Sequence, residues 1–226
     1  YYSKFGPKKY LARSLYYYGI IYFNRAEYEN AIVELTKAEK VAEKCDSLYW
    51  GISMMTQGEV YHETYNDFEE LKCLGSAKEV FAALSNQHYL NGVNLQLAYA
   101  NANLENFEDA LQILNELLHR DDVIYAVAAA ALKLYAYIKV VKDKPDMEHA
   151  RELYDSYTDK YTIDHLTEKD YWAWAYVLYM TGSKDMSEMI VDQLTSEGVT
   201  GPGAYWLYRI NKGKGAWEEA LRYLEK

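Results

Sequence analysis

The residues best suited to chemistry are the histidines, and one of them opens a metalloprotease-like motif. His62-Glu63 begins like His-Glu-x-x-His, in which two histidines one helical turn apart hold zinc and the glutamate acts as a base. Tyr65-Asn66 stands where the second histidine is required. None of the five histidines has a partner at the i, i+4 spacing of a metal site on a helix. We therefore expect no metal site and no catalytic histidine.

Paired carboxylates are the next candidates, because hydrolases use two acidic groups as acid and base. The pairs Glu69-Glu70 and Asp121-Asp122 are better explained as solvated helix starts, where negative charge favours the helix dipole. The chain also lacks a glycine-rich phosphate loop and a Gly-x-Ser-x-Gly nucleophile motif. We expect the protein not to be an enzyme and to carry no cofactor.

Composition narrows the partners. The chain has 226 residues, half of them hydrophobic, and a formal net charge of −10. This charge disfavours binding to nucleic acid or to an anionic membrane, both of which need clustered Lys and Arg. The apolar run from Val127 to Leu132 ends at Lys133, well short of the roughly 20 residues of a membrane span. We expect a protein or peptide partner, no nucleic acid and no membrane insertion within this segment. The compartment is expected to be the cytoplasm or the periplasm, and the sequence does not determine the oligomeric state.

An internal repeat organises the chain. An aromatic or Met residue, two polar residues and a small or apolar residue recur as Tyr28-Glu-Asn-Ala31, Phe68-Glu-Glu-Leu71, Phe107-Glu-Asp-Ala110, Met147-Glu-His-Ala150, Met186-Ser-Glu-Met189 and Trp217-Glu-Glu-Ala220. The last members of successive copies are separated by 40, 39, 40, 39 and 31 residues. A period in this range is typical of a stack of supersecondary units.

Each unit has the apolar spacing of two helices. In the first unit the pattern predicts helix A over roughly 10–25 and helix B over roughly 28–45. Gly19, Gly58 and Ala98 are small residues that let helix A approach helix B closely. The aromatic residue that opens helix B is expected to cover the top of the hairpin. The second unit needs one extra residue in its turn to fit this pattern.

The sequence resembles the tetratricopeptide repeat (TPR) family. The residues at the family's signature spacings are Gly19, Tyr22, Ala31, Leu35 and Ala38 in the first unit, and Ala98, Ala110, Leu114 and Leu117 in the third. The resemblance implies an all-α, right-handed α-solenoid of about six antiparallel hairpins. It implies a single array with units roughly at 8–46, 47–86, 87–121, 122–163, 164–200 and 201–226. The last unit follows Gly201-Pro202-Gly203, the strongest helix breaker in the chain.

The long period carries a second implication. The usual TPR period is about 34 residues, and the longer spacing here is similar to the extended repeats of bacterial TPR-containing regulators. Both ends of the sequence look cut, so we expect a fragment of a longer chain. The resemblance leaves two functions open. One is a scaffold that binds a protein or peptide, and the other is a sensory segment that binds a small ligand or peptide and controls an output domain outside this sequence.

In the TPR family the helices A line the concave side, which is the usual binding face. The register projects three sets of residues onto it: Arg13, Tyr16, Tyr17, Ile20, Phe23 and Asn24; Ile52, Met55, Thr56, Glu59, His62 and Glu63; and Leu95, Gln96, Tyr99, Ala102 and Asn103. From these we predict ten partner-binding residues: Tyr16, Tyr17, Ile20, Phe23, Met55, Glu59, His62, Leu95, Tyr99 and Asn103. Aromatic and Met side chains favour flexible partners. Tyr16, Tyr17 and Ile20 stand near the positions where family members that bind chaperone tails clamp a carboxylate, so an acidic tail is disfavoured.

Two further features have alternative explanations. Asn91, Asn94, Asn101, Asn103 and Asn106 crowd one hairpin and are suited either to holding a peptide backbone or, as we prefer, to caps and local hydrogen bonds. An aromatic helix contains Tyr171, Trp172, Trp174, Tyr176 and Tyr179. Packing between repeats is the preferred explanation for it, and a platform for sugar or peptide is the alternative.

Overall fold

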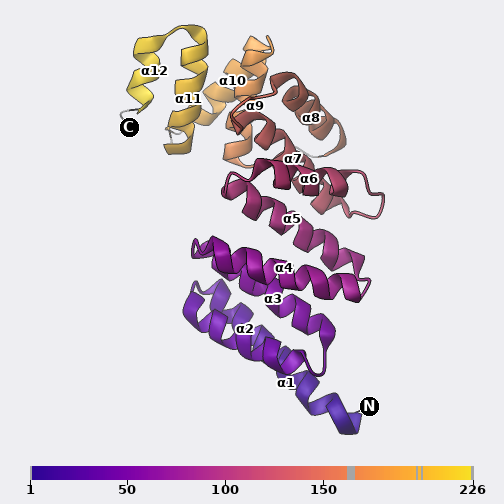
Figure 1. Ribbon diagram of the computed structural model, residues 1–226. Helices are drawn as coiled ribbons and strands as arrows, with labels where there is room; N and C mark the ends of the chain where they lie inside the picture. Colours follow the sequence, from indigo (N-terminus) through magenta and orange to yellow (C-terminus); the bar gives the residue numbers. More distant parts are fainter. Residues whose placement is uncertain (1, 162–165, 197, 200, 225–226) are drawn as a thin grey trace. The chain divides into compact units, whose positions relative to one another are not determined.

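The computed structural model describes residues 2–161, 166–196, 198–199 and 201–224, and every regular element in these ranges is a helix. The helices are α1 (Tyr2–Asn24), α2 (Tyr28–Ala42), α3 (Ser47–Glu63), α4 (Asp67–Ala83), α5 (Gln87–Asn103), α6 (Phe107–Leu118), α7 (Tyr125–Val141), α8 (Met147–Lys160), α9 (Glu168–Met180), α10 (Lys184–Thr195), α11 (Gly201–Lys214) and α12 (Trp217–Leu224). Hairpins are formed by α1 with α2, α3 with α4, α5 with α6, α9 with α10, and α11 with α12 (Figure 1). The first helix begins earlier than the predicted residue 10.

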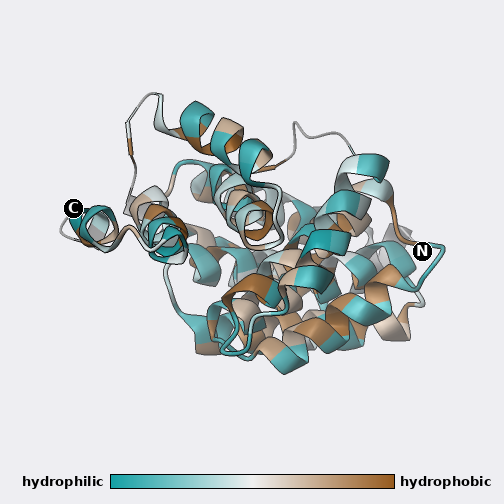
Figure 2. Ribbon diagram, turned by 90° about the horizontal axis from the view of Figure 1, so that it is seen from above, coloured by the Kyte–Doolittle hydropathy of each residue, from teal (hydrophilic) through white to brown (hydrophobic). Residues whose placement is uncertain are grey.

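The chain divides into two compact units, residues 1–128 and 129–226, which are described separately below. Teal and brown residues are interspersed along the helices in Figure 2, as expected for helices that pack on one stripe and meet solvent on the other. Within the described residues, no helix combines the length and the apolar character that a membrane crossing needs.

Several of the turns between the helices share one backbone geometry. In the first unit four turns each have a residue with positive φ: Ala26 (57°), Tyr65 (55°), Ser85 (51°) and Glu105 (60°). The next residue donates its N–H to a carbonyl of the preceding helix, as in the 2.9 Å bonds from Glu27 to Tyr22 and from Asn66 to Tyr61. Bonds of this kind satisfy carbonyls left open at a helix C-terminus. The turn before α4 therefore matches the turn before α2, and the extra residue predicted there is absent.

This shared turn corrects the register of two repeats. The fifth residue after the left-handed residue is buried in each A–B hairpin that has such a turn: Ala31, Glu70, Ala110, Ser187 and Ala220. The predicted equivalents Leu71 and Met189 are wrong, and Met189 is 72% exposed. The error arises because Phe68 was aligned with Tyr28, whereas α4 begins at Asp67. Phe68 is 75% exposed, so it does not cover the hairpin as predicted.

The role of the small helix-A residues is confirmed in the first unit. A Cβ added to Gly19 would lie 2.6 Å from Cγ of Leu35, and one added to Gly58 would lie 2.7 Å from Cδ2 of Leu74. Real Cβ atoms essentially never approach other heavy atoms so closely, because such distances lie well inside van der Waals contact. Each glycine therefore sets the spacing of its hairpin.

The core of the first unit is continuous from α3 to α5. Its buried residues come from these three helices: Met54, Leu74, Ala77, Val80, Phe81, Val93, Leu97 and Ala100. Partly buried hydrophobic residues pack against this cluster: Leu48, Trp50, Ile52, Met55, Leu71, Tyr89, Leu90 and Ile113. The rings of Phe81 and Tyr89 stack with their centroids 5.0 Å apart. This packing joins one hairpin to the next, as in repeat proteins whose units cannot bury their apolar faces alone.

In the second unit α9 is buried almost all round. Trp172, Trp174 and Tyr176 are each less than a tenth exposed, so the packing explanation for the aromatic helix is confirmed for these three rings. Gly203 lies against the indole of Trp172, where an added Cβ would come within 2.8 Å of the ring. The predicted breaker at residues 201–203 is wrong in its detail, because these residues form the first turn of α11. Proline is tolerated in a first turn, where an N–H has no helical partner.

Candidate functional site

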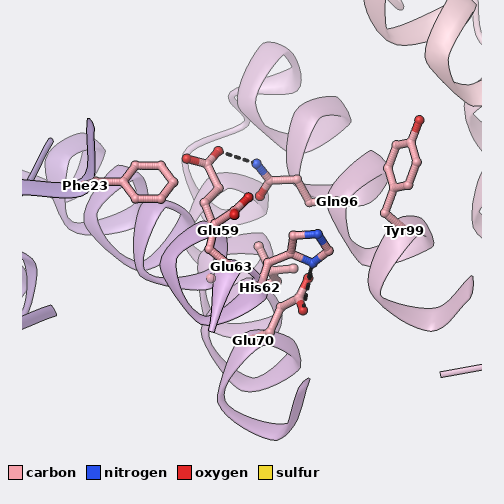
Figure 3. Close-up of a pocket in the computed structure, with 9 residues that line it drawn as sticks. Phe23, Glu59, His62, Glu63, Glu70, Gln96 and Tyr99 are labelled. Carbon is pink, nitrogen blue, oxygen red and sulfur yellow. Dashed lines mark hydrogen bonds and ion pairs between the residues drawn. The ribbon is translucent and has the colours of Figure 1, made fainter. Parts of the chain in front are cut away.

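The first unit contains a cavity of about 320 Å³ that is lined by residues of α1, α3, α4 and α5 (Figure 3). Its lining residues are Phe23, Gly58, Glu59, His62, Glu63, Glu70, Leu74, Gln96 and Tyr99. The α3 residues recur at the spacing of one helical face, so a single helix presents most of the polar groups. The lining thus combines carboxylates with apolar and aromatic side chains.

Glu59 and Gln96 connect α3 to α5 across the cavity. Nε2 of Gln96 donates a 2.5 Å hydrogen bond to Oε1 of Glu59. Burial raises the pKa of the Glu59 carboxyl, and the bond from Gln96 partly opposes this shift. Oε1 of Gln96 is buried and has no hydrogen-bond partner among the described residues. The amide therefore keeps a buried carbonyl oxygen that lacks a donor among the described residues.

Glu70 and His62 form a second pair, between α4 and α3. Nδ1 of His62 lies 3.2 Å from Oε1 of Glu70 and 3.3 Å from Oε2. Glu70 is only 4% exposed, so the prediction of a solvated helix start is wrong for this residue. Burial raises the pKa of the Glu70 carboxyl, while the neighbouring His62 acts in the opposite direction. The register explains the burial, because Glu70 occupies the core position that Ala31 and Ala110 fill in the adjacent hairpins.

Two aromatic side chains flank these carboxylates. Figure 3 shows Phe23 on one side of Glu59 and Tyr99 on the other side of Gln96. Glu63 contributes a third carboxylate at the exposed side of the cavity. No Lys or Arg is among the lining residues. The site is consequently acidic in its polar part and aromatic at its flanks.

The geometry does not fit a metal ion. Within the part of the chain that the structure describes, no three His, Cys, Asp or Glu side chains converge as metal ligands. Calcium and magnesium need six or more oxygen ligands at short distances.

The cavity brings together four of the ten predicted partner-binding residues: Phe23, Glu59, His62 and Tyr99. The other six lie outside it: Tyr16, Tyr17, Ile20, Met55, Leu95 and Asn103.

Tyr16 packs against the buried cluster of Ala31, Leu35 and Val60, and its ring meets that of Tyr49 edge-on. Met55 is half-buried against the α3–α5 core. Contacts of this kind support stability as well as any role in binding.

The remaining four residues are more exposed or less well tied to the core. Tyr17 is 55% exposed, and its hydroxyl lies 3.1 Å from that of Tyr49. Ile20 and Leu95 are half-buried, and Asn103 is exposed. Their role in partner binding stays a prediction.

Glu70, Gly58 and Leu74 line the cavity but were not predicted as binding residues. Gln96 and Glu63 were projected onto the helix-A face without being selected. A sequence signal for Glu70 does exist, because it follows Gly58 by twelve residues, as Ala31 follows Gly19. Alignment on the small residue of helix A, rather than on the aromatic of helix B, would have placed a glutamate in a core position.

The row of asparagines mostly makes local bonds. Asn101 donates to the carbonyl of Leu97 at 2.8 Å, and Asn91 accepts from Gln87 at 2.8 Å. The preferred explanation of local hydrogen bonding is confirmed for these two residues. Oδ1 of Asn94 is buried and has no partner among the described residues.

The second unit contains a cavity of different character, of about 560 Å³. The guanidinium of Arg209 lies 4.4 Å from the ring centroid of Tyr176 and 5.7 Å from that of Tyr205, and all three residues line the cavity. Cation–π contacts hold a guanidinium in one orientation. This cavity is basic and aromatic, in contrast to the acidic one in the first unit.

Comparison with known proteins relates the chain to helical repeat structures. No family model matches the sequence, and no curated protein matches it. The solved structure titled as a functional characterisation of Pseudomonas aeruginosa PilF has a TM-score of 0.66 at 16% identity, covering 96% of this chain and 90% of that one. The TPR-like repeats of a putative kinesin light chain from Podosopora anserina give 0.62 at 14% identity, covering 84% and 95%. A second structure of those repeats, carrying a substitution, gives 0.63 at 13% identity, covering 92% and 98%.

These likenesses, together with the twelve helices observed in the described residues, define an all-α solenoid of the TPR-like class. The predicted fold class is therefore confirmed. The fold is an array of helical repeats, each of which packs mainly on its neighbours.

Proposed function

We propose that this protein is a non-catalytic scaffold that binds an extended segment of another protein in the cavity between α1, α3 and α5. The observation that supports the proposal is the cavity itself, which lies on the helix-A face and opens beside exposed groups of α3. Preformed grooves bind peptides well because little ordering of the receptor is needed. The division of the array into the six predicted units is part of the same proposal.

The dimensions favour a side chain of a peptide over a whole small-molecule ligand. A volume of about 320 Å³ lies at the lower end of the range for ligand pockets. It can enclose one long side chain while the peptide backbone stays on the surface. Tyr17, Ile20 and Asn103 are placed on the same helices, α1 and α5, and we propose that they contact the flanking peptide residues.

The alternative is a sensory segment that regulates an output domain elsewhere in a longer chain. The sequence of the complete gene product tests this alternative, because a membrane span, a kinase or a DNA-binding module beyond these residues would favour it. Peptide binding in the cavity is compatible with either function, so the cavity can be tested first.

Site-specific photo-crosslinking tests the proposal. A photoreactive phenylalanine replaces Tyr99 in one version of the protein and Phe68 in a second version, in the cells that make the protein. Tyr99 lines the cavity, whereas Phe68 does not line it and is 75% exposed. We expect a discrete partner to be crosslinked from position 99 and not from position 68, and mass spectrometry then identifies the crosslinked segment.

Binding in the cavity would be contradicted if the same partner were crosslinked from positions 99 and 68, or if neither position gave a crosslink. Circular dichroism of both proteins checks that the substitutions leave the helices folded. A peptide made from the crosslinked segment should then bind the purified wild-type chain in solution, and Glu59→Lys should weaken that binding.

A further inference from the structure

We propose that the cavity of the first unit is a receptor for one basic side chain, Arg or Lys, of the bound peptide. This inference rests on the proposed function and names the chemistry of its partner. The argument has four parts: the unneutralised carboxylates, the unpaired amide oxygen of Gln96, the aromatic flanks, and the position of Glu70 in the repeat.

The carboxylates of the cavity have no Lys or Arg partner among the described residues. Among the described residues, no Lys or Arg nitrogen lies within 4.0 Å of Glu59, Glu63 or Glu70, and the only ion pair made by the three is that of Glu70 with His62. Buried carboxylates are costly unless they are paired and hydrogen-bonded. A bound cation would supply the missing compensation, so the cavity is complementary to positive charge.

The amide of Gln96 adds a directed acceptor. Its Nε2 is fixed on Glu59 by the 2.5 Å bond, which leaves the buried Oε1 without a donor among the described residues. Buried polar atoms in native proteins nearly always have a partner. A guanidinium or ammonium group carries several N–H donors and no acceptor, so it can bond to this oxygen and to a carboxylate at the same time.

The aromatic residues suit the rest of a basic side chain. Arg and Lys combine a charged head with an apolar stem that packs along apolar surface. Phe23 and Tyr99 flank the carboxylates (Figure 3), and Leu74 lies in the same lining. Aromatic faces also attract cations directly. A peptide with an acidic side chain at this position would meet like charge, in agreement with the predicted absence of a carboxylate clamp.

The position of Glu70 in the repeat is hard to explain by folding alone. Ala31 and Ala110 fill the equivalent positions with no exposed surface, which shows that the hairpin packs well without a charged group there. His62, Glu59 and Glu63 are the titratable groups from α3 that line the cavity with Glu70, and Tyr99 is the one from α5. A glutamate in this core position therefore has its natural explanation in the ligand.

The experiment uses two capped amino acids that differ only in charge. N-acetyl-arginine N-methylamide is the probe, and the citrulline analogue is its neutral control of the same shape. Both are titrated into the full chain while the side-chain amide of Gln96 and the ring of His62 are followed by NMR. We expect saturable shifts at both groups with the arginine probe and none with citrulline. Glu59→Gln and Glu70→Gln should each weaken binding about tenfold, as for the loss of a charged hydrogen bond.

Glu79→Gln is the matched control, because Glu79 is exposed on α4 and does not line the cavity. It should leave the affinity unchanged. Equal binding of arginine and citrulline, or unchanged affinity in both Glu59→Gln and Glu70→Gln, would overturn the inference, and so would the absence of any shift up to the solubility limit of the probe. These outcomes differ from a failure of the proposed function, in which position 99 gives no crosslink to any partner.

Discussion

The ammonium of Lys133 on α7 lies 3.1 Å from the carboxylate of Asp170 on α9 in the second unit, and both side chains are largely buried. The same carboxylate accepts a 2.9 Å bond from the backbone N–H of Thr167 and so caps α9. We predict that Asp170→Ala lowers the free energy of unfolding by about 3 kcal/mol, because it removes the carboxylate that pairs with the largely buried ammonium of Lys133. Chemical denaturation followed by circular dichroism measures the change.

Asp170→Asn separates the two roles of this residue. An asparagine oxygen can still accept the capping bond from Thr167, whereas the ion pair with Lys133 is lost. We therefore expect its stability to lie between that of the wild type and that of Asp170→Ala. Asp185→Ala, at an exposed site in the first turn of α10, serves as the control. Equal stabilities of the Ala and Asn variants of Asp170 would show that the cap contributes nothing.

Removing the charge of Glu70 should stabilise the ligand-free protein at neutral pH. Because burial raises the pKa of Glu70, the folded state binds its proton more tightly than the unfolded state. The contribution of this group is then most favourable below the unfolded pKa of about 4.3, and it is lost as the pH rises through the folded pKa. We predict that Glu70→Gln is more stable than the wild type at pH 7 and that the difference shrinks toward pH 4.

Thermal unfolding of both proteins between pH 4 and 7 measures this difference. Glu63→Gln is the comparison, since Glu63 lines the same cavity at an exposed position and should change stability little at any pH. Together with the titration of the arginine probe, the result tests whether Glu70 lowers the stability of the ligand-free protein while strengthening its binding of the probe. A wild type more stable than Glu70→Gln at pH 7 would mean that the pair with His62 outweighs the cost of burial.

Two glycines of one hairpin should respond to alanine in opposite directions. A Cβ on Gly58 would lie 2.7 Å from Cδ2 of Leu74, whereas one on Gly75 meets nothing within 4 Å. We predict that Gly58→Ala destabilises the protein by about 1–3 kcal/mol through overpacking. Gly75→Ala should stabilise it by about 0.5–1 kcal/mol, because alanine loses less backbone entropy in a helix. Denaturant midpoints of the two variants measure both effects, and a stabilised Gly58→Ala would contradict the close approach of α3 and α4.

The same glycine shows how much of the fold could be predicted from the sequence. Close approach of two helices dictates a small residue at the contact, so Gly19 and Gly58 marked the hairpins before the structure was known. The helices followed from the apolar periodicity, and the solenoid class followed from the repeat and its resemblance to the TPR family. The turn register did not, because the aromatic residue that opens helix B is half-buried in one hairpin, as Tyr28 is, and largely exposed in another, as Phe68 is.

The candidate site was only partly predictable for a related reason. Phe23, Glu59, His62 and Tyr99 face the cavity because helical periodicity sets the direction of a side chain. Glu70 approaches His62 only when the register of α4 is known to the residue. The bond from Gln96 to Glu59 joins residues 37 positions apart, and it depends on how two neighbouring hairpins stack. Sequence periodicity holds no information about that stacking distance.

The last prediction concerns a buried hydroxyl in the second unit. Tyr154 has no exposed surface, and its hydroxyl has no hydrogen-bond partner among the described residues. Burial raises its pKa well above the ordinary value, so the group is neutral and contributes only the cost of its lost hydration. Leaving a buried polar group unsatisfied costs about 1–3 kcal/mol. We therefore predict that Tyr154→Phe raises the free energy of unfolding by about 1 kcal/mol.

Tyr49→Phe is the matched control for this change. Its hydroxyl lies 3.1 Å from that of Tyr17, so the same substitution there removes a bonded group and should lower stability slightly. Urea denaturation of both variants compares the two directions. If Tyr154→Phe is instead destabilised by more than Tyr49→Phe, the hydroxyl of Tyr154 has a partner in solution, and a buried water bonded to the nearby Trp174 indole would be its natural identity, because Nε1 of that indole is also buried without a partner among the described residues.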